Sequence, residues 1–97
     1  MLGMGGLEFE WDDAKNAANA AKHGVGFVIA RNVFKDVFAV ELVDDRQDYG
    51  EERYNIIGMV EGRMLLVVYT MRGEVIRIIS ARGATPHEQR RYHEENS

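Results

Sequence analysis

The chain of 97 residues contains no cysteine, a single proline and a single tryptophan. Without cysteine there can be no disulfide, no thiolate metal ligand and no cysteine nucleophile, which suits a reducing cytoplasm, the location we expect. The longest apolar run, Met64 to Tyr69, is far too short to cross a membrane, so we expect no membrane association. The three histidines lack a short ligand spacing, and we expect neither a metal nor another cofactor.

Hydrophobic residues make up 45% of the chain and charged residues 29%, which is typical of a small globular domain. A chain of this length suffices for one domain with one modest core. Residues 1–6 lack the basic and long apolar regions of a signal peptide, so we interpret them as a flexible leader. We therefore assign a single domain to residues 7–97.

The net charge of −4 is spread unevenly along the sequence. Residues 1–61 carry six Lys/Arg and twelve Asp/Glu (−6), residues 62–93 carry six and two (+4), and the last four residues add −2. Affinity for nucleic acid follows the local charge of a surface and not the total. The basic part is either a surface for an anionic polymer or a set of arginines at outward strand positions, and charge alone leaves both readings open.

Periodicity predicts an α+β fold. Residues 7–11 alternate as in a short edge strand, residues 13–23 form a helix that Gly24 ends, and a second helix runs from Phe27 to about Asp36. Four further strands are expected at residues 37–43, 54–60, 64–70 and 75–81. Short glycine turns join the last three into an antiparallel meander. The expected fold is an N-terminal edge strand and two helices packed on a mostly antiparallel four-stranded sheet, with a C-terminal helix.

The C-terminal helix begins at Pro86, because Thr85 and Glu88 form a capping box around it. This helix has almost no apolar stripe, so we expect that the domain's own core does not hold it. A protein partner or a second copy of the chain would then cover this helix, and in the second case the protein would be a homodimer. The expected partner contacts are Arg90, Arg91 and Tyr92.

Several charged residues are candidates for chemistry. Lys22 and His23 close the first helix, where they either interact with its last carbonyls or provide a proton-transfer group. In the loop before the predicted strand at residues 54–60, Glu51 either orients Arg53 or forms an ordinary surface ion pair. Strict alternation puts Arg77 on the face with Val75 and Ile79, and Ile76, Ile78 and Ser80 on the other. Arg77 must then pair with an acid such as Glu51 or point into a shallow site.

These residues belong to motifs that resemble the BrnT family of toxins, and the resemblance spans residues 7 to about 92. The motifs are Phe9-Glu10-Trp11-Asp12, Lys22-His23-Gly24-Val25, Asp45-Arg46 with Tyr49-Gly50-Glu51 and Arg53, and Ile76-Arg77-Ile78-Ile79-Ser80-Ala81-Arg82. The resemblance implies a fold related to the RelE ribonucleases. It also implies the toxin of a type II toxin–antitoxin system, a metal-independent endoribonuclease that cleaves RNA and inhibits translation. A BrnA-type ribbon-helix-helix antitoxin would neutralise it, and operator DNA would be bound only through that antitoxin.

The resemblance implies an RNA site of charged residues on and beside the sheet, with Lys22, His23, Glu51, Arg53, Arg77 and Arg82 as candidates. The division into roles, and the addition of further arginines, is our own hypothesis. The catalytic candidates are His23, Glu51, Arg53, Arg77 and Arg82. The RNA-binding candidates are Lys22, Arg46, Arg63 and Arg72. No motif with an activated nucleophile is present, so a second hypothesis stays open: a non-catalytic, toxin-like binding or regulatory module that acts only through a protein partner or nucleic acid.

Overall fold

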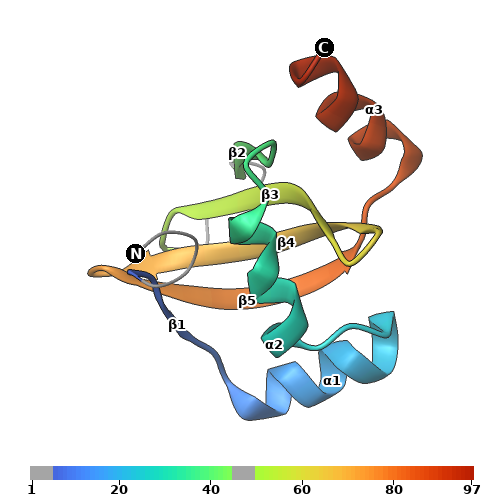
Figure 1. Cartoon of the computed structure of the whole chain (residues 1–97). Coiled ribbons are helices and arrows are strands. Elements are labelled where there is room, and N and C mark those ends of the chain that lie inside the picture. Colours follow the sequence, from blue (N-terminus) through green and yellow to red (C-terminus); the bar gives the residue numbers. More distant parts are fainter. Residues whose placement is uncertain (1–5, 45–49) are drawn as a thin grey trace.

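A computed structural model describes residues 6–44 and 50–97 (Figure 1). In chain order the elements are β1 (Glu8–Glu10), α1 (Asp13–His23), α2 (Phe27–Ala30), the 3-10 helix η1 (Arg31–Lys35), β2 (Val40–Asp44), β3 (Arg53–Val60), β4 (Arg63–Arg72), β5 (Val75–Gly83) and α3 (Pro86–Glu95). None of the helices in the described ranges has the length and apolar character needed to cross a bilayer.

The strands form one sheet in the order β1-β5-β4-β3-β2. All neighbours are antiparallel except β1, which runs parallel to β5 with Phe9 opposite Ile76. The predicted α+β class and the meander of β3, β4 and β5 are confirmed. The count of four strands in the sheet is wrong, because the N-terminal strand joins it as a fifth. Its apolar residue, Phe9, packs against the core on the helix side.

Helix α1 begins and ends as predicted. The Asp12 carboxylate accepts a hydrogen bond from the Lys15 amide at 2.9 Å, and Gly24 ends the helix in the left-handed conformation with φ 72°. The anchor to the sheet is the buried Asn19. Its Nδ2 donates to the carbonyl oxygens of Val25 (3.0 Å) and Ala81 (2.7 Å), and its Oδ1 accepts from the Ala81 amide at 3.1 Å. Asn19 therefore ties the middle of α1 to β5.

The second predicted helix is divided into α2 and η1, and the strand after it starts three residues later than expected, at Val40 instead of Val37. The cause is Asp36. Its carboxylate accepts from the Phe38 amide at 2.9 Å, and its carbonyl accepts from the Ala39 amide at 3.1 Å. This turn uses the backbone groups that the first residues of a longer strand would need.

The sheet has a core on each face, and Figure 1 shows α1 and α3 at opposite sides of it. The helix side, under α1, α2 and η1, holds the larger core, whose largest fully buried side chains are Phe27, Val33, Leu65, Val67 and Ile78. On the other face Ile57 and Leu66 pack against Tyr92 of α3.

Helix α3 is held by its own domain, contrary to the expectation from its polar sequence. Tyr92 is 7% exposed, and its hydroxyl donates to Oδ2 of Asp36 at 2.7 Å. Nδ2 of Asn96 donates to the Phe38 carbonyl at 2.9 Å. A single buried aromatic residue with a carboxylate partner replaces the apolar stripe that an amphipathic helix usually needs. The predicted capping box is present.

A β-bulge interrupts the pairing of β4 and β5. Val68 lies opposite Ser80, but the next residue, Tyr69, lies opposite Ile78. Ile79 is therefore an extra residue in β5 without a partner in β4. Strict alternation does not hold across it, and the predicted placement of Ser80 on the same face as Ile78 is wrong.

Candidate nucleic-acid interface

The bulge at Ile79 puts two candidate arginines on one face of the sheet. Arg77 lies opposite Thr70 and Arg82 lies opposite Leu66. Thr70 and Leu66 are four residues apart in β4, so they share a face, and directly paired residues share a face as well. In a regular strand, two residues five apart would point to opposite faces. The extra residue brings Arg77 and Arg82 to the same one.

Two more candidates lie on this face. Arg72 follows Thr70 by two residues in β4 and so shares its face. Val68, two residues before Thr70, lies opposite Asn55 of β3, and Arg53 precedes Asn55 by two residues, which puts Arg53 on the same face. We call this surface, which carries Arg53, Arg72, Arg77 and Arg82 on the side of the sheet away from α1 and α2, the arginine face. Helix α3 borders it where Tyr92 packs on Leu66.

Glu10 holds two of these arginines. Its Oε2 lies 2.9 Å from Nη1 of Arg77 and 3.9 Å from Nε of Arg72. The sequence suggested Glu51 as an acid for Arg77. The acid is Glu10 because β1 runs parallel beside β5 and brings it opposite Arg77, which is 26% exposed. The Arg77 guanidinium is thus positioned but still reaches the surface.

Glu88 holds Arg82 in a fork of two hydrogen bonds. Nη1 and Nη2 of Arg82 donate to the two carboxylate oxygens of Glu88 at 2.8 and 2.9 Å. The Thr85 amide donates to the same carboxylate at 2.9 Å. The hydrogen bond from Arg82 is the largest influence on the pKa of Glu88, and with the capping contacts it lowers that pKa in spite of partial burial. Glu88 is therefore ionised at neutral pH and fixes the guanidinium plane.

The contact between Glu51 and Arg53 is looser. Oε2 of Glu51 lies 3.4 Å from Nε of Arg53, and the Glu51 side chain is 36% exposed. The next residue is better fixed, because the carbonyl of Glu52 accepts from the hydroxyl of Thr70 at 2.6 Å. Arg46, another RNA-binding candidate, lies outside the described residues.

Lys22, His23 and Arg63 do not join the arginine face. Lys22 and His23 form the last turn of α1 on the helix side of the sheet. Nη2 of Arg63 lies 3.4 Å from the carbonyl oxygen of His23, and so donates to one of the carbonyls that a helix end leaves without an internal partner. This placement favours a structural role for all three at the helix C-terminus.

The three residues proposed for partner contacts on α3 also separate. Arg90 is exposed, and Nη2 of Arg91 lies 3.8 Å from Oε2 of Glu95. Tyr92 is buried against Ile57 and Leu66, so it is not available as a surface contact.

A comparison with protein families identifies the chain. The model of the BrnT ribonuclease toxin of type II toxin–antitoxin systems matches residues 11–88. The chain belongs to this family. The match runs from Trp11 to Glu88, and so includes the four arginines of the arginine face and the acid that holds Arg82. A comparison with curated proteins gives no match. Membership of the BrnT family supports a toxin role and implies an antitoxin as partner.

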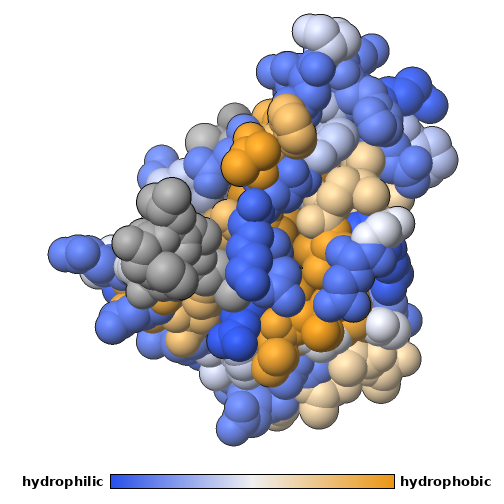
Figure 2. Space-filling model, in the orientation of Figure 1, coloured by the Kyte–Doolittle hydropathy of each residue, from blue (hydrophilic) through white to orange (hydrophobic). Residues whose placement is uncertain are grey.

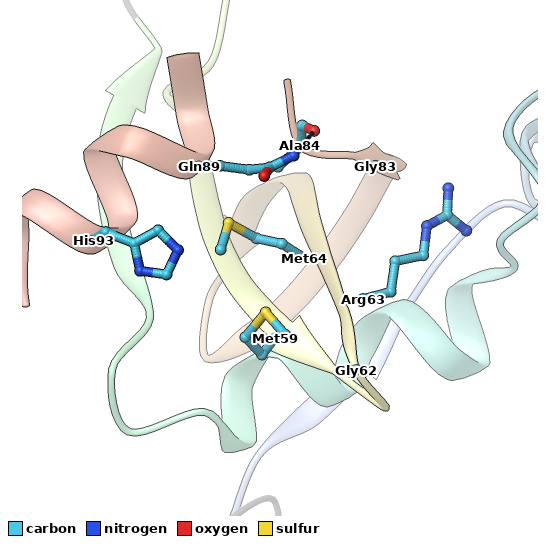
Figure 3. Close-up of a pocket in the computed structure, with 8 residues that line it drawn as sticks. All are labelled: Met59, Gly62, Arg63, Met64, Gly83, Ala84, Gln89 and His93. Carbon is cyan, nitrogen blue, oxygen red and sulfur yellow. Dashed lines mark hydrogen bonds between the residues drawn. The ribbon is translucent and has the colours of Figure 1, made fainter. Parts of the chain in front are cut away.

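This BrnT family member also has a pocket that the sequence did not reveal. It lies between α3 and the turn joining β3 to β4, and its volume is about 460 Å³. Figure 3 shows Met59 and Met64 facing Gln89 and His93 across it, while Arg63 extends away. The only signal in the sequence is the pair of methionines flanking that turn, and methionine is as common in cores as in pockets.

The chemical capacity of the arginine face is to bind phosphate and to accept a proton. Guanidinium groups bind phosphate oxygens by paired hydrogen bonds, and carboxylates beside them can act as bases. Within residues 6–44 and 50–97, no three His, Cys, Asp or Glu side chains come together in a way that could hold a metal ion.

Proposed function

We propose that this member of the BrnT family is a metal-independent endoribonuclease that cleaves RNA on the arginine face and so inhibits translation in the cytoplasm. We also propose a BrnA-type antitoxin as the partner that neutralises it and through which alone it binds operator DNA. The observation that carries the proposal is the bulge at Ile79, which brings Arg77 and Arg82 to the face where Arg53 and Arg72 also lie. A regular strand would have sent Arg82 into the helix-side core.

Arg77 and Arg82 are suited to stabilise the phosphate during cleavage. As the RNA 2′-oxygen attacks the neighbouring phosphorus, negative charge grows on the phosphoryl oxygens. Glu10 and Glu88 hold the two guanidiniums at 2.9 Å or less before any substrate binds. Donors that are already oriented need little rearrangement in the transition state, which is the condition for strong electrostatic catalysis.

Glu51 is the acid that we propose as the general base. Glu10 contacts two arginines and Glu88 is bound by Arg82 and the Thr85 amide, whereas Glu51 is exposed and has one loose contact with Arg53 among the described residues. Glu51 would take the proton from the 2′-hydroxyl. The 2′-oxygen then bonds to phosphorus, and the 5′-oxygen leaves and takes a proton from water. The products are a 2′,3′-cyclic phosphate and a 5′-hydroxyl end.

The test is cleavage of single-stranded RNA by the purified chain in the presence of a chelator. We expect Arg77→Ala and Arg82→Ala each to slow cleavage by about two to three decades, which corresponds to roughly 2–4 kcal/mol of lost transition-state stabilisation. Arg90→Ala removes the same charge from the exposed side of α3 and should cleave normally. Cleavage that needs an added divalent ion, or that all three variants retain, would refute the proposal.

A second candidate function is supported by the ion pairs themselves. Arg77 and Arg82 each already lie against a carboxylate, which reduces the positive charge that they offer to RNA. A non-catalytic binding module would tolerate this arrangement. The same assay separates the two functions, because a binding module retains RNA on the protein but produces no 2′,3′-cyclic phosphate ends.

A further inference from the structure

The edge of β2 is open in the described sheet. β2 is the last strand in the order β1-β5-β4-β3-β2, and its register with β3 has no shift. Edge strands are usually protected from further pairing by charged side chains, proline or a bulge. β2 contains no proline and no bulge, and its two charged residues, Glu41 and Asp44, are both acidic, so they would oppose only a partner of the same charge. In the described part of the chain, no hydrogen bond from beyond β3 reaches the backbone of Val40, Glu41 or Leu42.

Two exposed apolar residues lead into this edge. Val37 is 88% exposed and Phe38 is 58% exposed. Figure 2 shows apolar surface where the chain enters β2, next to α3. The backbone of Phe38 is fixed, because its amide donates to the Asp36 carboxylate and its carbonyl accepts from the Asn96 side chain. The two side chains are therefore held outward on an ordered backbone, which is a common property of contact surfaces.

The charge of the edge strand determines which partner fits. Residues 40–44 carry two Asp/Glu and no Lys or Arg, or −2. Pairing of two β2 strands about a two-fold axis would bring two such segments together, and like charges across strands are destabilising. On the helix side, the hydroxyl of Tyr69 donates to Glu41 and that of Tyr54 donates to Glu52. These neutral donors leave both negative charges in place.

We propose that β2 binds an extended segment of a protein partner as a sixth strand, and that this segment alternates apolar with Lys or Arg residues. Backbone hydrogen bonds to the open edge would supply affinity, and the alternation would supply selectivity. Basic side chains of the segment would meet Glu41 on the helix side. Its apolar side chains would extend the surface of Val40 and Leu42, which pack toward Tyr92 on the other face. The inference rests on the proposed function only in naming the antitoxin as the natural source of such a segment.

The test uses the full chain and two synthetic probes, a short peptide of alternating valine and lysine and its counterpart of alternating valine and glutamate. Titration is followed by amide chemical shifts and by fluorescence anisotropy, without RNA, so that it is independent of any cleavage activity. We expect saturable binding of the lysine peptide, with shifts concentrated in β2, and no binding of the glutamate peptide.

Charge variants then locate the site. Glu41→Lys should weaken the lysine peptide by about fivefold or more, since an attraction across neighbouring strands becomes a repulsion. Glu74→Lys makes the same charge change at an exposed position in the turn between β4 and β5 and should bind as the parent does. Glu41→Gln removes the charge but keeps an acceptor for the Tyr69 hydroxyl, so it controls for misfolding. We expect it to weaken binding of the lysine peptide as well, but less than Glu41→Lys does.

Three results would overturn the proposal. Equal binding of both peptides would show that charge does not select the partner. If Glu41→Lys and Glu74→Lys weakened binding of the lysine peptide equally, the effect would be one of total charge and not of a site at β2. A concentration-dependent dimer that shifts the β2 amides would show that the edge takes a second copy of the chain instead.

Discussion

Removal of one hydroxyl group should loosen the C-terminal helix. In Tyr92→Phe the ring still packs on Ile57 and Leu66, but Asp36 loses the hydroxyl that now donates to it at 2.7 Å. Asp36 keeps its bonds from the Met59 and Phe38 amides at 2.8 and 2.9 Å. The variant therefore isolates one hydrogen bond to a charged acceptor at a buried position.

A hydrogen bond to a charged group contributes about 1.5–3 kcal/mol to stability. In a domain of this size each kcal/mol changes the melting temperature by roughly 4–8 °C, so Tyr92→Phe should melt at least about 6 °C lower. Tyr92→Ala also loses the packing of the ring, and truncation of a buried aromatic costs about 3–5 kcal/mol. Tyr54→Phe is the matched control. It removes a hydroxyl that donates to Glu52 at the same distance of 2.7 Å, but at an exposed position, and should lose less.

The pH dependence provides a second measure of the same bond. Burial, followed by the hydrogen bond to Asp36, raises the pKa of Tyr92 from 10.0 to about 12. The folded state thus favours the neutral phenol, and this stability is complete below pH 10 and lost as the pH rises toward 12. Burial alone would raise the pKa of Asp36, but hydrogen bonds from Met59, Tyr92 and Phe38 outweigh it and lower the pKa below 3.8. The stability from Asp36 is present above pH 3.8 and lost as the pH falls through its folded value.

The assay is urea denaturation of the parent, Tyr92→Phe and Tyr54→Phe across this pH range, with hydrogen exchange of the α3 amides at neutral pH. The gap between the parent and Tyr92→Phe should be constant from about pH 5 to pH 9 and narrow at both ends. Equal losses in Tyr92→Phe and Tyr54→Phe, together with unchanged exchange in α3, would refute the view that Tyr92 anchors the helix.

Three further predictions concern stability. Gly58→Ala should cost about 1–3 kcal/mol in urea denaturation, because its Cβ would lie 2.5 Å from Cγ2 of Val33; Gly26→Ala, whose nearest atom would be at 3.5 Å, should cost much less. Asn19→Leu should lower the melting temperature strongly, because the carbonyl of Val25 and the carbonyl and amide of Ala81 lose their hydrogen bonds to Asn19. Each buried group without a partner costs about 1–3 kcal/mol. Glu88→Gln should be less stable than the parent above pH 4.5, and the difference should vanish as the pH falls through the lowered pKa of Glu88.

Local features of the fold could be predicted from the sequence because their signals are local. The bounds of α1 match residues 13–23, since Asp12 and Gly24 are a cap and a stop that act within one helical turn. The capping box at Thr85 and Glu88 also depends only on neighbours in the chain. The glycine turns place β3, β4 and β5 within one or two residues of their observed bounds.

Features that depend on distant parts of the chain could not be predicted in the same way. The alternation of residues 7–11 indicates a strand but not its neighbour, and the neighbour, β5, is more than sixty residues away in the sequence. Tyr92 has one apolar ring on a polar helix, so no periodic signal marks it as an anchor. Its hydroxyl donates to Asp36, which lies 56 residues earlier in the sequence and comes close only in the folded chain.

The bulge at Ile79 and the two chain ends together produce the candidate site. The bulge aligns Arg77 and Arg82, but the acids that hold them come from opposite ends of the domain, Glu10 from β1 and Glu88 from α3. The Arg77–Glu10 pair depends on the docking of β1, and the Arg82–Glu88 pair depends on the docking of α3.

Loosening α3 should therefore disturb the second pair and spare the first. Since Tyr92 holds α3 to the sheet, the stability of that helix and the orientation of the Arg82 guanidinium are coupled through one aromatic side chain. A surface that needs both arginines in place would lose function before the sheet itself unfolds.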